Sequence, residues 1–71
     1  MTRSQRKRCR ELTMGCWWPD LATGLECPAW AHIADELDVI RRDEIIRGDH
    51  QRASEAQALS KAAAAMLQVL P

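Results

Sequence analysis

The feature that most constrains this chain is the long stretch over residues 28–70, where almost nothing interrupts a helix. Between Pro28 and Pro71 the sequence contains one glycine, Gly48, and no proline. Proline is tolerated at the first position of a helix, because the N–H that it lacks would be unpaired there. Residues 53–65 contain seven alanines, and alanine has the highest helix propensity. The sequence therefore predicts an all-α fold centred on this stretch.

Gly48 divides the stretch into two predicted helices. Glycine commonly ends a helix in the left-handed conformation, and an aspartate such as Asp49 can cap the start of the next helix. We therefore expect an antiparallel helical hairpin with helices over residues 28–47 and 49–70. The alternative is one continuous helix, since a glycine in a helix interior costs only about 1 kcal/mol.

Each predicted helix carries one apolar stripe at helical spacing. On the first helix the stripe comprises Trp30, Ile33, Ala34, Leu37, Ile40 and Ile45. On the second helix it comprises Ala56, Leu59, Ala63, Met66, Leu67 and Leu70. Two helices share one seam and cannot enclose a core, and chains this short usually need a metal, disulfides or a partner. We therefore expect the hairpin to be completed by dimerisation.

The residues before the hairpin divide by charge and composition. Residues 1–10 carry five basic side chains and no acid, whereas residues 11–71 carry five basic side chains against ten acids, a balance of −5. Residues 11–27 contain Gly15, Pro19 and Gly24 and show no sustained periodicity, with a turn expected near Pro19 and Asp20. We predict a flexible basic arm over 1–10, an irregular segment over 11–27 that packs on the helices, and the helical hairpin over 28–71.

The sequence also predicts the cellular location. No apolar run approaches the roughly 20 residues needed to span a bilayer, and the basic start is not followed by the hydrophobic region of a signal peptide. Three cysteines, an odd number, do not indicate a disulfide framework. We expect a cytoplasmic protein without a membrane partner, in which Met14 offers an alternative start that would omit the basic arm.

The cysteines can also be considered as metal ligands. Three thiolates and one imidazole form an accepted structural zinc set, and the chain supplies Cys9, Cys16, Cys27 and His32 in that order. This order resembles that of the CCCH zinc fingers, a family that binds RNA, although the spacings differ from those of the family and no Cys-x-x-Cys is present. Scattered cysteines also serve as small apolar residues. We therefore predict no cofactor, with a zinc site at these four residues as the alternative.

An enzymatic function is not expected. Catalysis needs a preorganised pocket with an acid, a base or a nucleophile held in place, whereas two helices offer only a groove. No serine or cysteine has a histidine at a spacing that a hairpin would bring close. The adjacent acids Asp35–Glu36 and Asp43–Glu44 fall on a face expected to be solvated.

The function expected from the sequence is that of a small regulatory or inhibitory protein that binds a larger protein. Small helical proteins without recognisable chemistry are typical of phage and mobile-element effectors, which is an analogy of type. Val39 and Ile46 lie outside the apolar stripe and have acids close by. Trp17 and Trp18, which are adjacent in the sequence, either cover the helices or anchor a partner protein. The predicted partner-binding residues are Val39, Ile46, Asp35, Asp38, Asp43, Trp17 and Trp18.

The alternative function is nucleic-acid binding through the basic arm. Lysine and arginine side chains that neutralise phosphates provide sequence-independent affinity that falls with salt. The residues concerned are Arg3, Arg6, Lys7, Arg8 and Arg10. The same segment would otherwise be a solvated tail.

Overall fold

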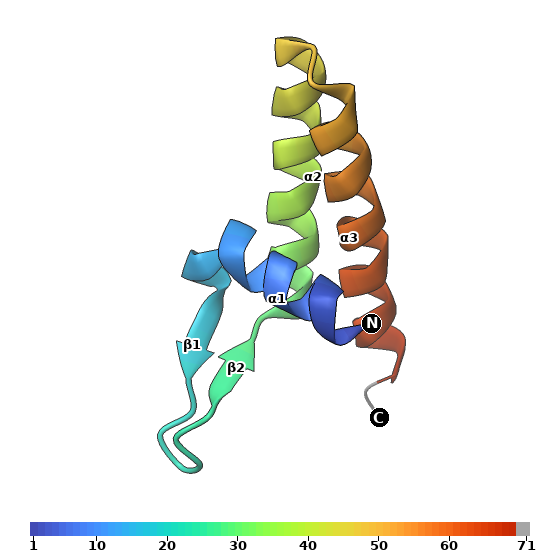
Figure 1. Cartoon of the computed structure of the whole chain (residues 1–71). Coiled ribbons are helices and arrows are strands. Elements are labelled where there is room, and N and C mark those ends of the chain that lie inside the picture. The colour runs from blue at the N-terminus through green and yellow to red at the C-terminus, as the bar shows by residue number, and fades with distance from the viewer. Residues whose placement is uncertain (70–71) are drawn as a thin grey trace.

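A computed structural model describes residues 1–69 of the chain, so that Leu70, the last member of the predicted stripe, and Pro71 lie outside the described residues. Two long helices lie side by side, a short helix crosses them near one end, and a small ribbon of two strands projects beside it (Figure 1). The elements in chain order are α1 (Arg3–Leu12), the 3₁₀ turn η1 (Met14–Cys16), β1 (Trp17–Pro19), β2 (Glu26–Pro28), α2 (Trp30–Arg47) and α3 (His50–Val69). The fold is thus mostly helical, as expected, and it adds a two-stranded sheet and a third helix, α1, that the sequence did not predict.

The break between α2 and α3 confirms the predicted hairpin. Gly48 adopts a left-handed conformation with φ of +82°, and its N–H donates to the carbonyls of Glu44 and Ile45. The carboxylate of Asp49 then accepts a hydrogen bond of 3.1 Å from the N–H of Arg52 and caps α3. A continuous helix through residue 48 is therefore excluded. The first helix of the hairpin, α2, begins at Trp30 and not at Pro28 as predicted, because Pro28 belongs to β2.

The seam between α2 and α3 contains most of the apolar residues that the periodicity predicts. Ile33 and Leu37 are fully buried, and the hydroxyl of Ser60 donates to the carbonyl of Ala34 across the seam at 3.0 Å. On α3 the buried residues are mostly small, which allows the two helices to approach closely. They are Ala53, Ala56, Leu59 and Ala63.

Two residues predicted in the apolar stripes lie largely outside the seam. Ile45 is 45% exposed and Leu67 is 46% exposed, whereas Glu44 is buried. The buried or half-buried positions on α2 run through 33, 37, 40 and 44, the alternating spacing of four and three that keeps one face against a partner helix. Ile45 is turned about 100° away from Glu44 around the helix axis. The buried face of α2 therefore ends at Glu44 and not at Ile45 as predicted.

Most of the predicted flexible basic arm, residues 1–10, forms the helix α1 instead, which continues over residues 11 and 12 of the predicted irregular segment. The helix begins with a capping box, in which the Thr2 hydroxyl accepts from the N–H of Gln5 at 3.1 Å and the Gln5 side chain accepts from the N–H of Thr2 at 2.9 Å. Cys9 is fully buried in the core, which anchors one side of α1 to the body of the protein. The charged side chains occupy its other faces.

Residues 17–27 of the segment predicted to be irregular form, together with Pro28, an antiparallel ribbon that closes the core. The register pairs Trp17 with Pro28 and Trp18 with Cys27, and the connection includes Gly24 at φ of +72°. Trp17 is buried with Cys9 and the α2–α3 seam in one cluster. Within this segment Trp17 is buried against the helices, whereas Trp18 is 53% exposed.

The buried seam predicts a large difference between two aliphatic residues of α2. Replacing fully buried Leu37 with alanine leaves a cavity, and we expect a loss of about 2–5 kcal/mol in the free energy of unfolding. Replacing Ile46, which is 83% exposed, should change this free energy by about 0.5 kcal/mol or less. Urea unfolding followed by circular dichroism measures both, and equal effects would contradict this assignment of the seam.

Candidate functional site

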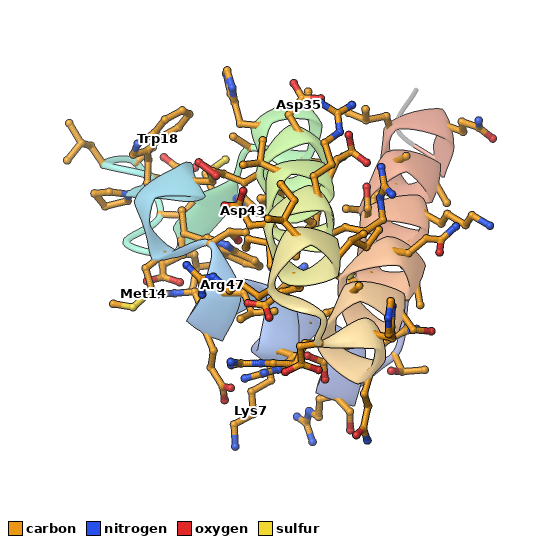
Figure 2. The ribbon with its side chains drawn as sticks, turned by 90° about the horizontal axis from the view of Figure 1, so that it is seen from above. Lys7, Met14, Trp18, Asp35, Asp43 and Arg47 are labelled. Atoms are coloured by element: carbon orange, nitrogen blue, oxygen red, sulfur yellow. The ribbon has the colours of Figure 1, made fainter. Side chains whose placement is uncertain are left out.

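The β1–β2 ribbon separates two grooves of opposite character. Consecutive side chains of a strand point to opposite faces, so the adjacent Trp17 and Trp18 belong to different sides of the ribbon. Trp17 lines one groove and Trp18 lines the other. In Figure 2, Trp18 and Asp35 lie towards one edge of the molecule and Lys7 lies at the opposite edge. The molecule therefore presents two separate candidate surfaces.

The first groove, which we call the acidic groove, lies between η1, β1 and α2. Its volume is about 310 Å³, and two carboxylates lie among its lining residues. The Trp18 ring packs edge-on against His32, with the ring centroids 6.0 Å apart. This contact holds one edge of the indole while more than half of the side chain faces solvent. The lining residues are Gly15, Cys16, Trp18, His32, Asp35, Glu36 and Val39.

Three of the predicted partner-binding residues meet in the acidic groove. Trp18 comes from β1, whereas Asp35 and Val39 lie one helical turn apart on α2. Asp43 and Ile46 are exposed on α2, further towards Gly48. They extend the same face of the helix beyond the groove.

The remaining two predicted residues are placed differently. The Asp38 carboxylate is paired with Arg41 at 3.0 Å and with Arg42 at 2.8 Å, so its charge is already compensated within α2. Trp17 is buried on the other side of the ribbon, where its ring meets Trp30 edge-on at a centroid distance of 5.5 Å. Neither residue is available to a partner at the acidic groove.

The second groove, which we call the basic groove, runs along α1 and has a volume of about 520 Å³. The guanidinium carbon of Arg6 lies 5.3 Å from the ring centroid of Trp17 and 5.5 Å from that of Trp30. Cations over indole rings are held by attraction to the ring quadrupole. The lining residues are Arg3, Arg6, Lys7, Arg10, Trp17, Leu25 and Glu26.

Arg10 connects the basic groove to the ribbon. Its Nε and Nη2 atoms each donate to a different carboxylate oxygen of Glu26 at 2.8 Å. This bidentate pair lowers the pKa of the Glu26 carboxyl and raises the pKa of the Arg10 guanidinium. Both side chains are partly exposed, so that the pair orients them more than it stabilises the fold.

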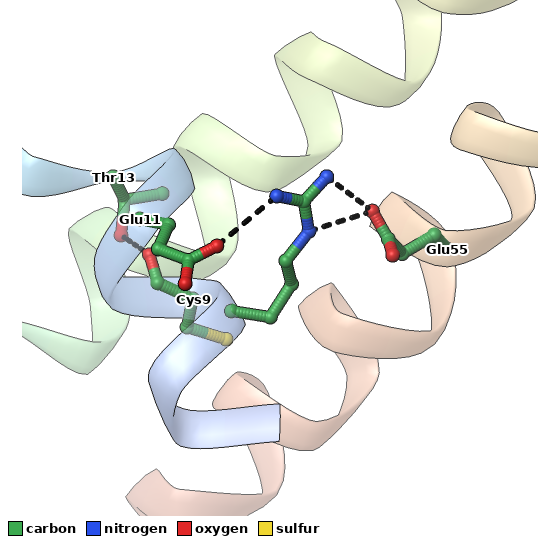
Figure 3. Close-up of polar contacts among 5 residues, drawn as sticks. Cys9, Glu11, Thr13 and Glu55 are labelled. Atoms are coloured by element: carbon green, nitrogen blue, oxygen red, sulfur yellow. Dashed lines mark hydrogen bonds and ion pairs between the residues drawn. The ribbon is translucent and has the colours of Figure 1, made fainter. Parts of the chain in front are cut away.

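Arg8 is the one predicted phosphate-binding residue that does not line the basic groove. Its guanidinium bridges Glu55 on α3 and Glu11 on α1, with contacts of 3.1 and 3.2 Å (Figure 3). The hydrogen bond to Glu55, and to a smaller extent the one to Glu11, raises the pKa of this guanidinium. Arg8 therefore joins α1 to α3, and the two glutamates compensate its positive charge.

The structure does not bring together the four residues of the alternative zinc site. Cys9 and Cys16 face the apolar core, Cys27 is exposed on β2, and His32 packs against Trp18. Within residues 1–69, no three histidine, cysteine, aspartate or glutamate side chains are arranged to hold a metal ion. Burial raises the pKa of the Cys9 thiol. The pKa of the Cys16 thiol is raised mainly by burial and to a smaller extent by the negative charge of Glu36. Both act as small core residues.

Sequence reasoning missed several residues of the two grooves. Glu36 and His32 were not assigned to a partner surface, and Leu25 and Glu26 were assigned to no site. The Thr2–Gln5 capping box was a local signal for α1. No comparable local signal showed that Glu26 would meet Arg10, because that contact depends on how the ribbon packs beside α1.

The chain matches no protein-family model, no curated protein and no solved structure. Over residues 1–69, none of the helices is both long enough and apolar enough to cross a membrane.

The burial of the thiols predicts unequal reactivity among the three cysteines. The thiolate is the reactive form, so raised pKa values and burial should slow the modification of Cys9 and Cys16. We expect Ellman's reagent to modify one thiol per chain rapidly at pH 7.5, and Cys27→Ser to abolish this fast phase. Rapid modification of two or three thiols in the folded protein would contradict the placement of these residues.

Proposed function

We propose that this protein is a small non-enzymatic binding protein that docks onto a larger protein through the acidic groove. The observation that supports the proposal is the meeting of exposed Trp18 from β1 with Val39 from α2, beside the carboxylates of Asp35 and Glu36. Tryptophan is enriched among the residues that dominate binding energy at protein interfaces. The groove thus combines an aromatic anchor with a defined charge.

The charge of the groove specifies the chemistry of the partner. Asp35 forms no ion pair within residues 1–69, and neither does Glu36. A partner segment that places a lysine or arginine against these acids and an apolar side chain against Trp18 would match both properties. Complementary charge speeds association and selects against partners of the wrong sign.

The proposed interface continues along α2. Val39, Asp43 and Ile46 follow one another at spacings of four and three residues, which places them on one face of the helix. Ile46 is 83% exposed, so a large aliphatic side chain faces solvent at this position. An interface that covers this face would bury Ile46 and would meet the carboxylate of Asp43, which forms no ion pair within residues 1–69.

The regulatory or inhibitory role remains a prediction from the sequence, as do the cytoplasmic location and the analogy with phage and mobile-element effectors. The structure supports the binding part of the proposal through an open groove with an anchor. The expectation that the protein is not an enzyme likewise remains a prediction.

A peptide-display selection tests the partner surface directly, because it does not require the natural partner. We expect random peptides selected on the wild-type protein to combine lysine or arginine with an adjacent apolar residue. Their binding should fall at least tenfold with Val39→Lys and with Trp18→Ala, because the anchor or its apolar neighbour is lost. Ile46→Lys then reports how far the interface extends along α2.

The matched control is Leu21→Lys, which makes a similar change at an exposed residue in the turn of the ribbon, outside the acidic groove. Circular dichroism checks that all variants keep the helicity of the wild type. Peptides without basic residues, or binding that survives both groove substitutions, would show that the proposed surface is wrong.

We also infer that the protein self-associates, which was expected from the small size of the two-helix seam. Ile45 and Leu67 were predicted in the apolar stripes, yet the chain itself leaves nearly half of each exposed. A second copy that covers them would remove this apolar surface from water.

Native mass spectrometry of the protein purified without chelator tests this inference. We expect the mass of a dimer, and a shift towards monomer with Ile45→Lys. A monomer at all accessible concentrations would contradict self-association, and the same spectra would reveal bound zinc.

A further inference from the structure

We propose that the basic groove of α1 binds the phosphodiester backbone of a nucleic acid and contacts phosphates rather than bases. The groove lies across the ribbon from the acidic groove, and the proposal is independent of the protein-binding function. Three features support it: the spacing of the cations, the contacts that orient Arg6 and Arg10, and the position of Arg6 over the rings of Trp17 and Trp30.

The cations of the groove repeat along one face of α1. Arg6 and Lys7 follow Arg3 by three and four residues and precede Arg10 by four and three, so the four cations lie on the same side of the helix over about two turns. Seven residues of helix rise about 10 Å, so the four cations form a short row. A polyanion with regularly spaced charges can contact several of them at once. Arginine, which supplies three of the four, offers a planar fork that matches phosphate oxygens.

Arg6 is oriented before any ligand arrives. Its guanidinium rests over Trp17 and Trp30, at 5.3 and 5.5 Å from the two ring centroids. A side chain that is already held in place loses less conformational freedom on binding, and this reduces the entropic cost of the contact. The flexible tail predicted from the sequence would lack this advantage.

The same contact decides which part of a nucleic acid is recognised. Stacking of bases needs an accessible aromatic face. Trp17 and Trp30 are buried, and Arg6 lies over both rings. The groove therefore offers charge but no stacking surface, which favours sequence-independent contacts with phosphates.

Glu26 moderates the charge of the groove. It holds the Arg10 guanidinium through two hydrogen bonds of 2.8 Å and compensates part of its charge. Binding of a phosphate to Arg10 must compete with this carboxylate. Removing the negative charge of Glu26 should therefore strengthen binding, an effect that a merely structural ion pair would not produce.

A nucleic acid fits the groove better than an anionic membrane surface does. The cations line a shallow, open groove along α1. Leu21 and Leu25 are exposed on the ribbon, but Asp20 and Glu26 adjoin them in the sequence. Insertion of the turn into a lipid interface would carry these carboxylates towards negatively charged headgroups, which would oppose binding.

Fluorescence anisotropy with the full chain tests the proposal. The probes are a labelled 20-bp DNA duplex of arbitrary sequence and a labelled single-stranded RNA of equal length, and the stronger binder identifies the source of the phosphates. With three to four contacts, the logarithm of the association constant should fall with the logarithm of the salt concentration at a slope of about −3. Duplexes of unrelated sequence should bind alike.

Matched variants separate the groove from general charge effects. Arg3→Gln with Lys7→Gln removes two groove cations and should weaken binding roughly 50-fold at 0.1 M salt, with a slope shallower by about two. Arg52→Gln with Lys61→Gln removes the same charge from exposed positions of α3 and should change affinity by about twofold or less. Glu26→Gln should strengthen binding several-fold and steepen the slope by about one.

Four outcomes would overturn the proposal. They are an absence of binding to either nucleic acid at 50 mM salt, equal losses in the two double variants, weaker binding by Glu26→Gln, and preferential binding to phosphatidylserine vesicles or polyglutamate. Circular dichroism of each variant establishes that the comparison is made between folded proteins.

Discussion

The packing of Trp17 against Trp30 is the interaction on which the rest of the structure depends. It joins β1 to the first turn of α2 through an edge-on contact between two large rings. The indole N–H of Trp17 donates to the Thr13 hydroxyl at 3.0 Å, and that hydroxyl donates to the carbonyl of Cys9. The end of α1, the ribbon and α2 are thereby fixed to one another by a single buried side chain.

Both grooves follow from the position of this side chain. Because Trp17 is turned inward, its neighbour Trp18 is turned to the other face of the ribbon and is available at the acidic groove. Arg6 lies over the ring of Trp17, so the basic groove is also organised around it. A chain with few aromatic residues thus uses one of them to define two surfaces of opposite charge.

The parts of the fold that could be predicted are those determined by neighbouring residues. Gly48 and Asp49 carry the conformational and capping preferences that end one helix and begin the next. The periodicity placed Ile33 and Leu37 correctly in the seam, but it failed at Ile45, because the seam ends on Glu44 when the chain turns. Helix α1 has too few apolar residues to show a stripe, and it contacts the core through buried Cys9 and partly buried Leu12.

The candidate sites depended more on contacts between distant residues. Sequence reasoning named Trp18, Asp35 and Val39 but could not show that they line one groove, because their proximity depends on the fold of the ribbon. It also treated Arg8 as equivalent to its neighbours in the basic segment. Glu55, 47 residues away, compensates the charge of Arg8 and removes it from the row of cations.

The prolines of the ribbon have a consequence for association between chains. β1 ends at Pro19 and β2 ends at Pro28, and each strand is three residues long. Proline lacks the N–H that an added strand would need as a donor, and short strands offer few pairing positions. The outer edges of the ribbon are therefore poor templates for further strands, and the molecule can keep a two-stranded sheet at its surface without inviting edge-to-edge aggregation.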